Sequence, residues 1–168
     1  MKQTLAIFLN KDKKIEQIRK KYVPNHEKFE PHITLVYPFE FKNQDKLRKH
    51  ITESIKDFEP FEISLKGLQK SAKGYYLYLL VDKGKEKIIS LHEKLNSGIL
   101  DTFRNPEMPK YIAHLSIGVF ESEEEREKAI KEISKINIGF ETKIKSIQLL
   151  TIDENHSLKF KEDFKLKF

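Results

Sequence analysis

The chain has 168 residues, of which 38% are hydrophobic and 35% charged, and its net charge is +6. This length predicts one domain over residues 1–168, and the mild positive bias favours an anionic partner such as RNA or a nucleotide, although a Lys-rich solvated surface would give the same balance. The absence of Cys excludes disulfides, thiol catalysis and Cys-ligated metals, and no apolar run approaches the ~20 residues of a membrane span, so we expect a cytoplasmic protein with no membrane contact.

Hydrophobic periodicity predicts strands and helices that alternate along the chain. A buried strand over residues 4–9 precedes a helix over 11–22, and Pro31 then introduces a strand over 32–39. The pattern continues with a helix over 44–58, strands over 61–68 and 75–81, a helix over 85–100 and a loop over 101–110. It closes with a strand over 112–120, a helix over 123–136, one long strand or two shorter ones over 138–152, and a Lys-rich edge strand over 157–164.

Two of these strands carry the same short pattern, a His followed two residues later by a hydroxyl residue. His32 and Thr34 lie in the first, and His114 and Ser116 lie in the second. Because side chains at i and i+2 of a strand point to the same face, each His is expected to lie beside its hydroxyl. A His can transfer a proton and a hydroxyl can donate to an oxyanion, so the two pairs could flank one phosphate.

The strand context gives this pattern its meaning, because the three-letter string alone also occurs by chance. A third match, His50-Ile51-Thr52, falls in the helix predicted over 44–58, where residues two apart point away from each other. We therefore interpret His50 as a surface residue. For His32 and His114, the competing interpretation is a pair of structural His residues that satisfy their hydrogen bonds locally.

The two motif strands also hold the same place in a repeat. Strand, helix, strand and hairpin partner follow one another over 32–81 and again over 114–164, and the strand after each helix begins with Phe-Glu, at Phe61 and Phe140. We predict an α+β fold of two pseudo-symmetric lobes, each an antiparallel sheet with helices on its outer side, facing a central cleft. An approximate two-fold axis would bring both motif strands together across that cleft.

Residues near the motif strands are candidate substrate contacts. Tyr37 and Phe39 could stack on a base, and core packing is their alternative role. Lys110 and Tyr111 could contact a phosphate or a base, and a solvated loop is the alternative for both. The sequence shows no Gly-rich phosphate loop, metal-binding cluster or close carboxylate pair, so catalysis is expected to use His without a metal or other cofactor.

The paired His-x-[Thr/Ser]-hydrophobic motifs, about 80 residues apart, resemble those of the 2H phosphoesterase superfamily, and within it the bacterial 2′-5′ RNA ligase and cyclic phosphodiesterase-like proteins. The resemblance covers nearly the whole chain. It implies a bilobal domain with a central cleft, in which His32 and His114 are the catalytic pair and Thr34 and Ser116 bind phosphate oxygens. The chain departs from many members directly before each motif. Glu30 stands where a basic residue is often found before the first His. Ile112 and Ala113 stand where many members have a basic residue and a Pro before the second His.

The resemblance further implies a metal-independent phosphodiesterase that acts on 2′,3′-cyclic phosphates of RNA ends or nucleotides, or on 2′,5′ linkages, with one His as general base and the other as general acid. Either His could take either role. The alternative is a non-catalytic RNA- or nucleotide-binding module with the same cleft. A His-based metal hydrolase is disfavoured, because two His without nearby carboxylates make a poor ligand set. We expect a monomer with no obligate protein partner.

Overall fold

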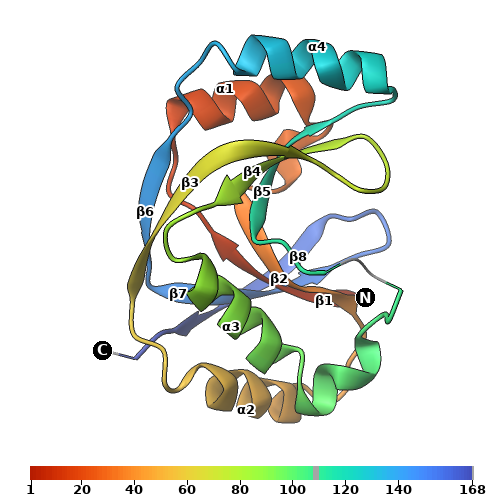
Figure 1. Ribbon diagram of the computed structural model, residues 1–168. Coiled ribbons are helices and arrows are strands. Elements are labelled where there is room, and N and C mark those ends of the chain that lie inside the picture. The colour runs from red at the N-terminus through yellow and green to blue at the C-terminus, as the bar shows by residue number, and fades with distance from the viewer. Residues whose placement is uncertain (108–109, 168) are drawn as a thin grey trace.

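Two antiparallel sheets with helices on their outer sides make up the computed structural model, which describes residues 1–107 and 110–167 (Figure 1). The first half of the chain forms β1 (Lys2–Phe8), α1 (Lys13–Tyr22), β2 (His32–Phe39), α2 (Gln44–Ile55), β3 (Phe61–Lys70) and β4 (Tyr76–Val81). The second half forms α3 (Lys85–Leu95), β5 (His114–Val119), α4 (Glu123–Ile133), β6 (Phe140–Ile144), β7 (Ser146–Ile152) and β8 (Leu158–Lys165). Two connections contain the short 3₁₀ helices η1 (His26–Lys28) and η2 (Gly98–Phe103).

Each sheet has four strands, in the orders β2-β1-β7-β8 and β5-β4-β3-β6, and neighbouring strands pair antiparallel throughout. β2 and β5 are therefore edge strands, and they pack against each other where the two sheets meet. This architecture confirms the predicted α+β class. It also places the two motif strands side by side.

The chain crosses between the two sheets, which refines the predicted repeat. The repeat over 32–81 predicts that β2, β3 and β4 share a lobe, but β3 and β4 belong to the sheet of β5. In the second half, β6 joins that same sheet, whereas β7 and β8 return to pair beside β1. The hydrophobic alternation of a strand indicates which face is buried but not which neighbour it pairs with. The sequence pattern therefore detects the repeated elements without assigning them to sheets.

Two helices pack against the sheet that does not contain the strands they connect. α1, which connects β1 to β2, packs against β5, and α3, which connects β4 to β5, packs against β2. In Figure 1, α1 lies beside α4 at one end of the molecule and α2 beside α3 at the other. Asp12 caps α1 by accepting a hydrogen bond from the Ile15 amide at 3.0 Å, and Ile15 and Ile18 bury its inner face. The crossing brings side chains of α1 to the junction of β2 and β5.

Several helices and strands end at other residues than hydrophobic periodicity predicts. α3 ends at Leu95 rather than near residue 100, because the chain turns into η2 through Gly98, whose φ of 58° lies in the left-handed region that favours Gly. η2 takes part of the loop predicted over 101–110, and residues 108–109 of that loop lie outside the described residues. The stretch 138–152 forms two strands, one of the two predicted alternatives, with the break at Lys145.

Candidate active site

β2 and β5 present their His-hydroxyl pairs in the same way. In both strands the aliphatic residues next to the motif side chains are buried. The motif side chains alternate with them on the partly exposed face: His32 and Thr34 in β2, His114 and Ser116 in β5. Because β2 and β5 are edge strands that pack against each other, the two motifs meet at the junction of the sheets. The local arrangement is the one that strand alternation predicts.

Both strands also bulge directly after the hydroxyl residue. The pairing of β2 with β1 shifts between Thr34 and Val36, and the pairing of β5 with β4 shifts between Ser116 and Gly118. In each case the motif strand contains one extra residue, and two consecutive residues after the hydroxyl are buried. A bulge bends its strand and re-aims the side chains that follow. The likeness of the two strands therefore extends beyond the four residues of the motif.

One cavity of about 220 Å³ is lined by all four motif side chains, and we call it the two-His cavity. Its other lining residues come from α1, from the connection after α1 and from β5: Arg19, Val23, Pro24, Asn25, His26, Phe29 and Leu115. Sites for small-molecule ligands usually measure roughly 300–1,000 Å³. The two-His cavity can therefore hold a group the size of a phosphate, and the remainder of a larger ligand would lie outside it.

The two imidazole rings are oriented by the same local hydrogen bond. Nδ1 of His32 lies 2.8 Å from the carbonyl oxygen of Glu30, and Nδ1 of His114 lies 2.7 Å from the carbonyl oxygen of Ile112. A carbonyl oxygen can only accept, so Nδ1 carries the proton and donates it in both rings. In the neutral form Nε2 then keeps a free lone pair, and each ring can take up or release a proton at that atom.

Burial lowers the pKa of both His residues, because the charged imidazolium is poorly solvated in the cavity. The hydrogen bonds to the Glu30 and Ile112 carbonyls act in the opposite direction with a smaller effect. The positive charge of Arg19 and the neighbouring His114 lower the pKa of His32 further. Both rings line the same cavity, and His114 is among the groups that lower the pKa of His32.

The surroundings of the two rings differ. Tyr78 stacks on His114 with ring centroids 3.8 Å apart and an angle of 28° between the planes. His32 instead lies near two phenyl rings in tilted contacts, Phe8 at 5.8 Å and Phe29 at 6.0 Å. The two motifs therefore share their backbone geometry but differ in the aromatic side chains around each imidazole.

The predicted substrate contacts lie in different surroundings in the structure. Tyr37 is 43% exposed and Lys110 lies exposed before β5, but among the described residues the lining of the two-His cavity includes neither. Phe39 is 3% exposed and packs 5.8 Å from Phe103. Its ring lies in the hydrophobic core on the buried face of β2, so of the two roles considered for Phe39 the structure shows core packing and not base stacking.

Tyr111 is engaged within the protein. Its hydroxyl donates to the carbonyl oxygen of Thr34 at 2.8 Å, and its ring stacks on His92 with centroids 3.7 Å apart. The connection before β5 is thereby bonded to the backbone of the first motif. This contact holds β2 in place, so the structure gives Tyr111 a supporting position behind the motif strand.

Arg19 also lines the two-His cavity, and no motif predicts it. It begins the basic run Arg19-Lys20-Lys21 but is only 6% exposed. The signal that could have identified it is helical spacing. Arg19 follows Ile15 by four residues and precedes Tyr22 by three, which places it on the inward face of α1.

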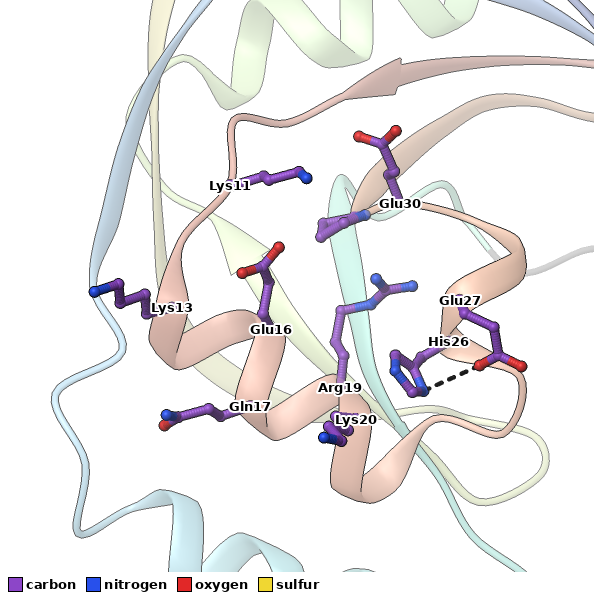
Figure 2. Close-up of a pocket in the computed structure, with 10 residues that line it drawn as sticks. Lys11, Lys13, Glu16, Gln17, Arg19, Lys20, His26, Glu27 and Glu30 are labelled. Carbon is purple, nitrogen blue, oxygen red and sulfur yellow. Dashed lines mark ion pairs between the residues drawn. The ribbon is translucent and has the colours of Figure 1, made fainter.

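A larger cavity of about 440 Å³ adjoins the two-His cavity and shares Arg19 and His26 with it (Figure 2). In Figure 2 the Arg19 side chain extends from α1 toward the space between Glu30 and His26. The other charged residues of this adjoining cavity carry both signs: Lys11, Lys13, Lys20, Glu16, Glu27 and Glu30. Because these charges are nearly balanced, the adjoining cavity does not attract a polyanion by charge alone.

The described residues contain no group of three or more His, Cys, Asp or Glu placed to hold a metal ion. Across residues 1–107 and 110–167, each helix is too short or too polar to cross a membrane.

Known proteins are similar to this chain in sequence or in fold. A protein of Bacillus licheniformis named "Putative phosphoesterase" is 26% identical over 168 residues, covering 95% of this chain and 96% of that protein. Among solved structures, TT0787 of Thermus thermophilus has a TM-score of 0.65 at 14% identity, covering 100% of both chains. E. coli LigT complexed with phosphate has a TM-score of 0.58 at 14% identity, covering 98% of this chain and 94% of LigT. These likenesses show a common fold.

A sequence profile of the 2′-5′ RNA ligase superfamily matches residues 8–156, which include both motif strands and most of the two sheets. The chain therefore belongs to the 2′-5′ RNA ligase superfamily.

Proposed function

We propose that the protein is a phosphodiesterase that hydrolyses 2′,3′-cyclic phosphates of RNA ends or nucleotides, or related phosphodiesters, by acid–base catalysis with two His residues and no metal. One observation carries the proposal: His32 and His114, both protonated at Nδ1, line one small cavity together with Thr34 and Ser116. The family supports phosphoester chemistry. LigT, which shares the fold, has been crystallised with phosphate and with 3′-AMP, which supports a nucleotide-type substrate for this chain.

The proposed reaction assigns one proton transfer to each ring. The neutral His accepts a proton at Nε2 from a water molecule as the water oxygen attacks phosphorus. The protonated His donates its Nε2 proton to the departing ribose oxygen as the bond from phosphorus to that oxygen breaks. One P–O bond forms and one breaks, which leaves a phosphomonoester beside a free hydroxyl. The hydroxyls of Thr34 and Ser116 donate to the nonbridging oxygens, where negative charge builds up.

The test is hydrolysis of a panel of 2′,3′-cyclic nucleotides and 2′,5′-linked dinucleotides in excess EDTA. His32→Ala and His114→Ala are each expected to lower kcat at least about 100-fold, because a positioned general acid or base contributes roughly 10²–10⁴-fold. His50→Ala is the matched control. It removes the His of the same three-letter string from α2, where Nε2 contacts the Leu95 carbonyl at 2.9 Å, and should leave turnover near that of the wild type.

Each alternative predicts a different outcome. Near-full activity of both cavity variants would contradict the paired-His mechanism. Activity that disappears in EDTA would favour a metal hydrolase. A single-turnover experiment in which the cyclic nucleotide binds but yields no product would favour the non-catalytic binding module.

A further inference from the structure

Arg19 carries a buried positive charge in the wall of the two-His cavity. Its side chain is 6% exposed, Nη2 donates to the Phe29 carbonyl at 3.1 Å, and Nε is buried with no hydrogen-bond partner among the described residues. Burial lowers the pKa of Arg19, and the charge of Glu16 raises it with a smaller effect. A guanidinium has five N–H donors, and a buried cation that is not matched by an anion is destabilising.

Arg126 shows how this chain accommodates a buried Arg with a structural role. It is also 6% exposed with an unpartnered Nε, but Nη1 donates to the carbonyls of Gly74 at 3.3 Å and Tyr76 at 3.2 Å. Nη2 of Arg126 forms an ion pair with the Glu123 carboxylate. Among the described residues, Arg19 has no carboxylate in an ion pair. The missing anion of Arg19 is therefore expected to come from a ligand.

We propose that Arg19 is the phosphate-binding cation of the two-His cavity, donating Nε–H and a second guanidinium N–H to nonbridging oxygens of the substrate phosphate. The identity of that substrate rests on the proposed function, whereas anion binding by Arg19 does not depend on turnover. The planar guanidinium matches two oxygens of a phosphate, which a Lys ammonium cannot do. The hydrogen bond to the Phe29 carbonyl fixes the orientation of the group before the ligand arrives.

The fold places this charge beside the proposed acid–base groups. α1 packs against β5, and Arg19 lines the same cavity as His32 and His114. Thr34 and Ser116 line the same cavity. A phosphate between the two His residues would therefore contact hydroxyls from both edge strands and the cation from α1. Fixed donors of this kind stabilise the charge that grows on the nonbridging oxygens during hydrolysis.

Binding of inorganic phosphate tests the site without relying on turnover. In an NMR titration of the wild-type protein, the Arg19 Nε–H resonance is expected to shift as phosphate binds. Arg19→Met keeps the length of the side chain but removes its charge and donors, and should weaken phosphate binding roughly 10- to 100-fold. Arg19→Lys keeps the charge but lacks the planar pair of N–H donors. Its phosphate affinity should lie between those of the wild type and Arg19→Met. Lys20→Met is the control, because Lys20 lines the adjoining cavity rather than the two-His cavity, and it should stay within about threefold.

Kinetics give a second readout. On a 2′,3′-cyclic nucleotide, Arg19→Met should lower kcat/KM about 100-fold through both a higher KM and a lower kcat, because the nonbridging oxygens are charged in the substrate and in the transition state. Arg19→Lys should restore part of the loss. Lys20→Met should leave both constants near their wild-type values.

The outcomes separate this inference from the proposed function. Unchanged phosphate affinity and kcat/KM in Arg19→Met, or a wild-type Nε–H resonance that does not respond to phosphate, would overturn the role of Arg19 even if both His variants lose activity. Phosphate binding that depends on Arg19 in a protein that hydrolyses none of the substrates would reject the proposed function and support the inference. If Arg19→Met does not fold, the wild-type resonance and Arg19→Lys decide the question.

Discussion

Each His in the two-His cavity is oriented by a backbone carbonyl, of Glu30 for His32 and of Ile112 for His114. A carbonyl fixes the tautomer as a carboxylate would, but it has no full negative charge to stabilise the imidazolium. Burial therefore outweighs the hydrogen bond, and both rings have a pKa below the ordinary value. At neutral pH the free protein holds both rings mainly in the neutral form.

This arrangement predicts an acidic optimum for the proposed reaction. The productive state has one neutral and one protonated ring, and its population grows as pH falls toward the region between the two lowered pKa values. We expect kcat/KM, which reports the free enzyme, to rise from pH 8 to a maximum below about 6.5 and then to fall. The measurement is a pH profile of kcat/KM on a cyclic nucleotide. A maximum above pH 7 would contradict the direction of the pKa shifts.

The sequence predicts some cavity residues better than others. Strand alternation is enough to place His32 beside Thr34 and His114 beside Ser116, because that relation is local. The role of Arg19 depends on α1 packing against β5, a contact between distant parts of the chain, and its basic neighbours resemble a solvated helix face. The catalytic and phosphate-binding roles of these residues remain predictions.

Among the secondary-structure elements, β2 depends on side chains from the second half of the chain. Two of its carbonyl oxygens accept hydrogen bonds, from Tyr111 at Thr34 and from His92 and Asn96 at Leu35, at 2.8, 2.7 and 3.0 Å. These side-chain donors add to the backbone pairing of β2, which as an edge strand has β1 as a neighbour on one side alone. The position of the first motif is therefore set by α3 and by the connection before β5.

Tyr111→Phe tests this support. The substitution keeps the ring on His92 but leaves the Thr34 carbonyl without its donor, so the free energy of unfolding should fall by about 1–2 kcal/mol. Urea denaturation with an unchanged m-value is the measurement. Tyr37→Phe removes a hydroxyl from a side chain that is 43% exposed, and its effect should be within about 0.5 kcal/mol. Equal stability of the two variants would show that the Tyr111 hydrogen bond contributes little.

The sequence predicts the existence and order of the strands and helices, because their periodicity is strong. It does not predict the matching bulges after Thr34 and Ser116, since a bulge depends on the register with the neighbouring strand. Nor does it predict the end of α3. Leu95 to Leu100 continues an apolar pattern, but Gly98 turns the chain into η2.

For the whole molecule, the crossing of strands means that neither half of the chain contains a complete sheet. β1 and β2 need β7 and β8, and β5 needs β4 and β3 from the first half. α1 and α3 also link the two sheets, because each packs against a strand of the sheet to which its own flanking strands do not belong. Loss of either sheet would expose the core of the other, so the two sheets should unfold together.

Single Trp residues can test this cooperativity, because the chain has no Trp of its own. Tyr76→Trp in β4 and Phe160→Trp in β8 replace side chains that are 42% and 53% exposed, one in each sheet. The urea midpoints from the fluorescence of both variants should agree with each other and with circular dichroism. Two separated transitions would show that the sheets are independent units, and circular dichroism of each variant against the wild type controls for the substitution itself.

β8 ends one sheet with Lys159, Lys161 and Lys165, and the Lys161 ammonium lies 4.2 Å from the centre of the Phe8 ring. Glu162 and Asp163 lie in the same strand, so charged side chains of both signs stand along this edge. A second copy that added its own β8 here would have to bring the charged side chains of the two strands close together. Charged residues along an exposed edge strand disfavour edge-to-edge aggregation, so the dense charge of β8 protects this end of the sheet.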